Sequence, residues 1–272
     1  MSWIALRITP ESNRDGVIAA LFESGSQGVQ EDGAAVVTHF PAGARIHEIR
    51  SAVMAADPRA DIAIADSPDT DYSQWRASVS SHQVGRLVIA PPWLARGLDP
   101  ETTVIIDPVM AFGTGEHPTT RGAMRLMQGL IRPGDVVADL GAGSAVLAIA
   151  AAKLGAARVA AVEIDHDAIG NAEENVRANS VSERVEVIEG DATTLLPLLA
   201  PVRVVIANII SSVIIPMLPL MKSSLSTGGQ AILAGILTEE RAAMISALEA
   251  GSWAVEREDT EDVWWSVQIA PR

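Results

Sequence analysis

The chain has no cysteine among its 272 residues. Disulfide bonds, thiolate metal sites and cysteine nucleophiles are therefore excluded, although the absence leaves the cellular compartment open. Histidine is scarce too, and the five histidines show none of the spacings that metal sites use; they stand at positions 39, 47, 82, 117 and 166. We therefore predict that the protein holds no metal ion.

Positive charge is in short supply. There are 20 Lys and Arg residues against 34 Asp and Glu residues, which gives a net charge of −14. Such a surface repels a phosphate backbone, so we expect no direct contact with nucleic acid and consider a basic protein or peptide the better partner. The alternative interpretation is that the acidic balance only keeps the protein in solution.

Long apolar runs are also missing. The first residues, MSWIALRITPES, lack a basic lead followed by an apolar stretch, and the apolar region 204–221 is interrupted by Asn208, two serines and two prolines. We therefore expect no membrane contact and a soluble, cytoplasmic protein, which we expect to be a monomer.

The apolar content of 48% is nevertheless high enough to fill the core of one large domain or two modest ones. Residues 1–66 predict a small α+β domain, in which Asp32-Gly33 indicates a hairpin. Strands are expected at 3–8, 28–30, 34–38 and 61–65, and helices at 11–23 and 44–55. The order βαββαβ is that of a ferredoxin-like fold, which commonly presents a binding surface.

Residues 67–101 are rich in Asp, Ser and Pro and are predicted to form a linker with one strand at 86–90. Its aromatic residues, which include Tyr72 and Trp75, suit packing against both domains better than a substrate-facing surface. From 102 to 272, apolar runs alternate with helical patterns, which predicts a doubly wound, mostly parallel α/β sheet. Strands are expected near 103–106, 136–140, 158–163, 184–188, 202–207, 230–234, 253–257 and 263–269.

The segment ADLGAGSAVLAIAAAKLGAARVAAVEID at 138–165 predicts a strand, a glycine turn, a helix and a second strand. The turn contains Gly141 and Gly143, and Gly155 ends the helix. The second strand brings Glu163 and Asp165 to its carboxyl end, where a carboxylate can accept hydrogen bonds from both hydroxyls of a ribose. This arrangement is typical of a nucleotide-cofactor site.

The glycine spacing indicates which cofactor binds. A dinucleotide fingerprint has the pattern G-x-G-x-x-G, in which the helix N-terminus meets a pyrophosphate. Here the third glycine position is Val146, and the small residues lie at 141, 143 and 145. The pattern therefore favours S-adenosyl-L-methionine, an adenosyl cofactor without phosphate, over a dinucleotide.

A second signature, DPVMAFGTGEHPTT, occupies residues 107–120. Gly113 and Gly115 allow the backbone to approach a ligand closely, and Thr114, Thr119 and Thr120 offer hydroxyls. Pro118 begins a predicted helix whose free N–H groups suit the carboxylate of the cofactor.

The segment 107–120, together with DLGAGSAVLAIAAAKLGA at 139–156 and VIANIISSVI at 205–214, resembles the ribosomal protein L11 methyltransferase family. The resemblance spans nearly the whole chain and implies a class I methyltransferase (Rossmann-like) domain at 102–272. It also implies that the N-terminal domain binds ribosomal protein L11. S-adenosyl-L-methionine is then the donor of methyl groups to lysine ε-amines and an α-amine of L11.

The resemblance places cofactor contacts at Thr120, Gly141, Glu163 and Asn208. The family usually has Asp at the position of Glu163 and GCGSG where this chain has GAGSA. The first difference keeps a carboxylate and lengthens its reach, and the second is expected to tighten the pocket slightly through Ala145.

Two further polar residues are expected beside the cofactor. Asp191 follows the strand 184–188 and is placed to receive the adenine amino group, although Gly-Asp is also a common turn. Asn208 follows the strand 202–207, and we predict that its side-chain oxygen holds an amine N–H and directs the nitrogen lone pair at the methyl group. The alternative for Asn208 is that it only caps the next helix.

Three other functions fit parts of the pattern. One is an S-adenosyl-L-methionine-dependent N-methyltransferase of another protein or a small amine. Another is a non-catalytic binding protein with a vestigial cofactor fold, which the intact signature segments oppose. The third is an NAD-dependent oxidoreductase, which Val146 and the missing phosphate site oppose.

Overall fold

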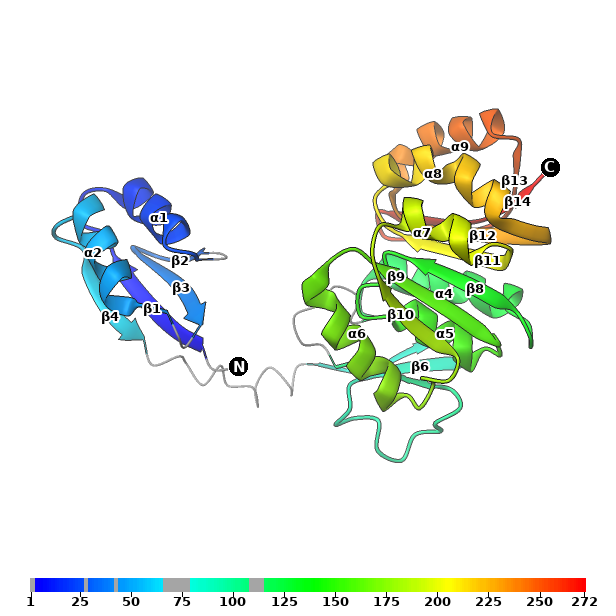
Figure 1. Ribbon diagram of the computed structural model, residues 1–272, viewed down its shortest axis with the longest axis horizontal. Coiled ribbons are helices and arrows are strands. Elements are labelled where there is room, and N and C mark those ends of the chain that lie inside the picture. Colours follow the sequence, from blue (N-terminus) through cyan, green and yellow to red (C-terminus); the bar gives the residue numbers. More distant parts are fainter. Residues whose placement is uncertain (1–2, 27–28, 42–43, 66–78, 108–114) are drawn as a thin grey trace. The chain divides into compact units, whose positions relative to one another are not determined.

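The computed structural model describes residues 3–26, 29–41, 44–65, 79–107 and 115–272. The chain divides into two compact units, Met1–Val79 and Ser80–Arg272 (Figure 1). Four residues that the sequence singled out, Tyr72, Trp75, Gly113 and Thr114, lie outside the described residues.

The N-terminal unit has the predicted order βαββαβ. Its described strands form one antiparallel sheet in the order β2-β3-β1-β4, and both helices cover one face of it. The core contains Leu6, Ile8 and Phe40 from the sheet and Val17 and Val53 from the helices. The elements are β1 (Trp3–Thr9), α1 (Arg14–Glu23), β2 (Val29–Asp32), β3 (Ala35–Pro41), α2 (Ile46–Ala56) and β4 (Asp61–Ala65).

The two helices of this unit are joined through Asp57, which follows α2. Its Oδ2 accepts hydrogen bonds from the backbone N–H groups of Glu11, Ser12 and Asn13 at 2.7–3.0 Å, just before α1 begins. These donors, foremost that of Ser12, hold the pKa of Asp57 well below its usual range. A carboxylate from the end of one helix therefore caps the start of the other.

The C-terminal unit contains the predicted doubly wound sheet. In residues 115–272, seven strands pair in the order β10-β9-β8-β11-β12-β14-β13. The first five are parallel, and a terminal hairpin adds β14 and β13 in antiparallel fashion. The strands are β8 (Val136–Leu140), β9 (Arg158–Glu163), β10 (Val185–Glu189), β11 (Val202–Asn208), β12 (Leu225–Leu237), β13 (Trp253–Glu261) and β14 (Trp264–Pro271).

Helices cover both faces of this sheet (Figure 1). One face packs against α4 (Pro118–Leu130), α5 (Val146–Lys153) and α6 (His166–Ala178), and the other against α7 (Ala192–Leu199), α8 (Ser211–Ser224) and α9 (Arg241–Ala250). Strand residues alternate between the two cores, so that Ile206 faces the first and Val205 the second. Both faces are apolar because a parallel sheet is buried on both sides.

The prediction that 103–106 belongs to the main sheet was wrong. The strand β7 (Thr103–Ile105) instead pairs with β6 (Leu87–Ala90) and β5 (His82–Val84) in a separate small sheet. The reason lies in Asn179, the residue directly after α6, whose side-chain amide bonds both the N–H and the C=O of Ile105. An asparagine side chain therefore takes the backbone groups that a neighbouring strand would need.

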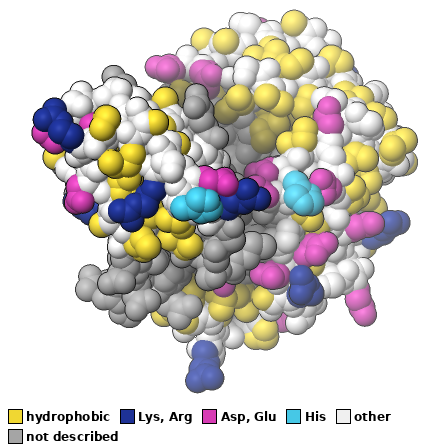
Figure 2. All heavy atoms as spheres, turned by 60° about the vertical axis from the view of Figure 1, so that its left-hand side comes forward, with side chains coloured by type: hydrophobic (Ala, Val, Ile, Leu, Met, Phe, Trp, Pro, Cys, Tyr) yellow, Lys and Arg dark blue, Asp and Glu magenta, His cyan; other side chains and the backbone are white. Residues whose placement is uncertain are grey.

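In the part of the chain that the structure describes, no helix is both long and apolar enough to cross a membrane. On the visible surface, acidic side chains are spread among basic and apolar ones (Figure 2).

Candidate functional site

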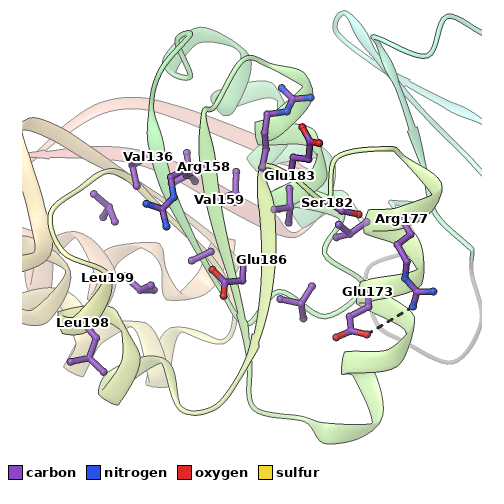
Figure 3. Close-up of a pocket in the computed structure, with 17 residues that line it drawn as sticks. Val136, Arg158, Val159, Glu173, Arg177, Ser182, Glu183, Glu186, Leu198 and Leu199 are labelled. Carbon is purple, nitrogen blue, oxygen red and sulfur yellow. Dashed lines mark ion pairs between the residues drawn. The ribbon is translucent and has the colours of Figure 1, made fainter.

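One cavity, of about 700 Å³, opens where the parallel strands begin. Val136 and Arg158 lie at the starts of β8 and β9, and the rim contains Glu173 and Arg177 of α6 and Leu198 of α7 (Figure 3). Ligands of doubly wound α/β domains bind instead at the carboxyl ends of the strands. This cavity lies at the amino ends of the parallel strands, opposite the end where a ligand is expected.

A second cavity, of about 660 Å³, lies at the carboxyl ends of the strands. The chain leaves β8 and β11 there, and the strand order reverses between these two strands. The lining brings together five of the six predicted site residues, Gly141, Gly143, Glu163, Asp191 and Asn208. We take this cavity as the candidate active site.

The glycine turn after β8 has the left-handed backbone that its sequence suggests. Gly141 and Gly143 have φ values of 72° and 51°. A Cβ atom on Gly141 would come within 2.4 Å of the Ile209 side chain, so a glycine is required for this close approach.

Ala145 also has a positive φ, of 63°, but it is fully buried in the core beneath α5. Because its methyl group lies in that core, Ala145 does not line the cavity, and the expectation that it narrows the pocket was wrong.

Glu163 ends β9 and fixes the glycine turn. Its Oε2 accepts a hydrogen bond from the backbone N–H of Gly143 at 2.7 Å, and Oε1 accepts from Ile164 and Asp165 at 2.9 Å. The second acid of the pair, Asp165, lies outside the cavity lining and caps α6 by accepting from the N–H of Asp167. Of the two carboxylates at this strand end, Glu163 therefore faces the ligand site.

A buried carboxyl group that the sequence analysis overlooked lies beneath the same turn. Asp139 is 1% exposed, and neither of its oxygens makes a hydrogen bond of normal geometry within the described part of the chain. Burial raises the pKa of Asp139 to about 7, with the amide of Ala148 opposing the shift in part and the nearby Glu163 carboxylate adding to it.

This shift predicts that the stability of the C-terminal unit declines as the pH rises from about 4 to about 7. The unfolded chain has the ordinary pKa of 3.8 at Asp139, so the folded state holds the proton more tightly and is favoured at low pH. Asp139→Asn removes the ionisable group. In thermal melts, the stability of the variant relative to the wild type should therefore increase as the pH rises from about 4 to about 7. A difference in melting temperature that does not change with pH would contradict this account.

Asn208 ends β11 with an unused acceptor. Its Oδ1 is buried and has no hydrogen-bond partner among the described residues, and its Nδ2 lies 3.5 Å from the hydroxyl of Thr120. The alternative role as a helix cap is not supported, because α8 begins after Ile210 and receives no side-chain cap. Thr120 itself is fully buried behind Asn208, and its neighbour Thr119 lines the cavity.

The wall beside Asn208 comes from α4 and the terminal hairpin. His117 and Trp264 line the cavity and pack edge to face, with ring centroids 4.8 Å apart. His117 also caps α4, since Thr119 lies within hydrogen-bond distance of its Nδ1. Burial lowers the pKa of His117, and the Arg121 guanidinium acts in the same direction, so the ring is neutral at pH 7. Because the sequence placed Trp264 only in a terminal strand, its place in the cavity wall was not predicted.

The structure also places Asp191 at the cavity, as the cap of α7. Its Oδ1 accepts from the N–H of Thr193 at 2.7 Å and from the hydroxyl of the same residue at 2.9 Å. Because both contacts with described residues are to Oδ1, the other oxygen can accept from a further donor.

Gly235 of β12 is a lining residue that sequence reasoning missed. It has a φ of 83°, and a Cβ there would lie 2.6 Å from the backbone oxygen of Ile209, the residue after Asn208. The pairing of β12 with β14 is irregular between Leu233 and Ile236. A lone glycine inside a strand is a known sign of a bulge or a close backbone approach.

The chemistry of the lining is acidic and apolar. Among the described residues, neither lysine nor arginine lines the cavity, whereas the carboxylates of Glu163 and Asp191 do. A pyrophosphate would therefore find no side-chain cation there. The apolar part of the described wall consists of Val162, Ile164, Ala192, Ile209, Ile210, Val213, Met217 and Trp264.

Comparison with known proteins shows the family of this chain. The family model described as ribosomal protein L11 methyltransferase (PrmA) matches residues 3–271. A ribosomal protein L11 methyltransferase of Exiguobacterium is 37% identical over 76% of this chain and 67% of its own length. One from Pelotomaculum thermopropionicum is 39% identical over 73% and 64%. The chain thus spans about two thirds of the length of these relatives.

A solved structure has a similar fold over part of this chain. The ribosomal protein L11 methylase from Lactobacillus delbrueckii subsp. bulgaricus is 27% identical and superposes with a TM-score of 0.65, over 71% of this chain and 100% of the solved chain. Because the family model matches almost every residue, this chain belongs to the ribosomal protein L11 methyltransferase family.

Proposed function

We propose that this protein is an S-adenosyl-L-methionine-dependent protein N-methyltransferase and that ribosomal protein L11 is its substrate. The observation that carries the proposal is the cavity at the carboxyl ends of β8, β9 and β11, which has carboxylates but no cation in its described lining. Such a lining suits a ligand that contains a ribose and a sulfonium but no phosphate.

The residues present fit this cofactor. Glu163 is placed to accept hydrogen bonds from ribose hydroxyls, and Asp191 has an oxygen left for the adenine amino group. Gly141 and Gly143 leave room for the ligand beside the turn. When bound, S-adenosyl-L-methionine supplies an activated methyl group that a nitrogen lone pair can accept.

The chain's own contribution to methyl transfer centres on Asn208. A lysine amine has a pKa of about 10.4 in water, and an apolar surrounding lowers that value and favours the neutral amine. The buried Oδ1 of Asn208 can accept one amine N–H and so direct the lone pair. Thr120 supports the Asn208 amide from behind. Most of the acceleration then comes from holding the reactants in line.

We assign substrate recognition to the N-terminal domain, residues 1–66, and catalysis to residues 102–272. We propose that the enzyme works as a monomer. A ribosomal protein as substrate implies that the enzyme acts in the cytoplasm.

Methylation of purified L11 tests this function. With isotopically labelled S-adenosyl-L-methionine, we expect label in L11 and mass increments of one methyl group each on lysine ε-amines and the α-amine. If the protein leaves L11 unmodified but transfers label to another protein or a small amine, then that molecule is the substrate in place of L11. The reaction class would stay the same.

A paired substitution tests the cofactor contacts. Glu163→Gln puts an N–H₂ group where the carboxylate now accepts three backbone N–H groups, so we expect the Kd for S-adenosylhomocysteine to rise about tenfold or more. Asp165→Asn is the matched control, because Asn also caps helices well and residue 165 does not line the cavity. Calorimetric titration should show loss of affinity in the first variant only. Equal losses in both would refute the role of Glu163.

A further inference from the structure

Two buried asparagines, Asn175 on α6 and Asn179 directly after it, hold backbone groups of β7, Asp107 and the glycine turn. Asn175 is 2% exposed and Asn179 is 6% exposed. Asn179 bonds the peptide groups of Ile105, with its Oδ1 accepting at 2.8 Å and its Nδ2 donating at 2.6 Å. This pair fixes the end of β7 against α6, as a neighbouring strand would.

Asn175 lies between the glycine turn and the start of the second signature. Its Nδ2 donates to the backbone oxygen of Ser144 at 3.1 Å, inside the turn. Its Oδ1 accepts from the backbone N–H of Asp107 at 3.0 Å. The two contacts fix the orientation of the amide, because a donor faces one side and an acceptor the other.

The position of this bridge matters for the cavity. Ser144 directly follows Gly143, whose N–H is held by Glu163 at the cavity wall. The turn is therefore fixed from two sides, by Glu163 toward the ligand and by Asn175 from behind. Neither Asn175 nor Ser144 lines the cavity in the described residues, so Asn175 acts on the ligand only through the backbone of the turn.

We infer that Asn175 is a positioning residue that holds the glycine turn in register with the backbone at Asp107 and so sets the affinity for the adenosyl cofactor. The inference rests on the proposed function, since it assumes that the turn binds that cofactor. Glycine turns need such support because their backbone has many accessible conformations. The helix α6 provides it because its own position is fixed by packing in the core.

The test compares three variants by calorimetric titration with S-adenosylhomocysteine, alongside thermal melts of each. Asn175→Leu keeps the approximate volume but removes both bridging contacts, and we expect the Kd to rise about tenfold. Asn175→Asp keeps the acceptor for Asp107 and loses the amide donor that Ser144 and Asn171 accept, so we expect a smaller rise. Glu174→Ala is the control; Glu174 is an exposed residue of the same helix, so the Kd of this variant should match the wild type.

The outcomes separate this role from a purely structural one. A structural role would lower the melting temperature of Asn175→Leu but leave the Kd unchanged at temperatures where the variant is folded, and that result would overturn the inference alone. If Asn175→Leu does not fold, an unchanged Kd in Asn175→Asp overturns it in the same way. If the wild type itself does not bind S-adenosylhomocysteine, the proposed function falls and this inference falls with it.

Discussion

Asn208→Ala is expected to lower kcat for methyl transfer about 10²-fold or more while the fold stays intact. The variant loses the acceptor that orients the amine, and misplacement of a reacting group by about 1 Å costs a factor of this size. The fold should survive because Oδ1 makes no hydrogen bond in the described structure and the contact to Thr120, at 3.5 Å, is long.

The measurement is turnover on L11 at saturating donor, together with a thermal melt. Asn208→Asp serves as the comparison because it keeps an acceptor oxygen in the same place, and it should retain more activity than the alanine variant. Near-normal turnover in Asn208→Ala would refute the role of this side chain.

The second large effect is expected from Gly235→Ala. The new Cβ would lie within 3.0 Å of three backbone atoms of Ile209, so the chain beside Asn208 has to move. The φ of 83° adds about 1–2 kcal/mol of strain for any residue with a side chain. We expect reduced stability and a loss of methyl transfer of about tenfold or more, because Asn208 is displaced from its working position.

Gly228 in the same strand provides the matched control. It has a similar φ of 70°, but a Cβ there would meet nothing within 4 Å. Gly228→Ala should therefore lose stability to the backbone strain and keep its activity at temperatures where it is folded. If the two alanine variants showed equal activity, the close approach at Gly235 would have no part in catalysis.

Much of the C-terminal fold was predictable because its signals are local. The apolar runs at 136–140 and 158–163 and the glycines between them specify one strand-turn-helix-strand unit, and the structure has it with nearly the predicted bounds. The position of Asn208 at a strand end was predictable for the same reason. Parallel strands that end at one edge bring their following residues together.

What the sequence did not reveal depends on contacts between distant segments. The strand at 103–105 joins the small sheet because Asn179, 74 residues away, takes the backbone groups of Ile105. A glycine inside a strand pattern, such as Gly235, indicates a bulge or a close backbone approach. The segment that approaches it, the backbone of Ile209, is known only from the fold. Asp139 had the signal of an acid in an apolar strand, and its raised pKa follows from burial that only the fold defines.

The most direct test of the account is a crystal structure of the protein with S-adenosylhomocysteine. We predict density for the ligand in the cavity at the ends of β8, β9 and β11, with the ribose hydroxyls on Glu163 and the sulfur facing the side chain of Asn208. A cavity that stays empty, or a ligand bound elsewhere on the chain, would contradict it.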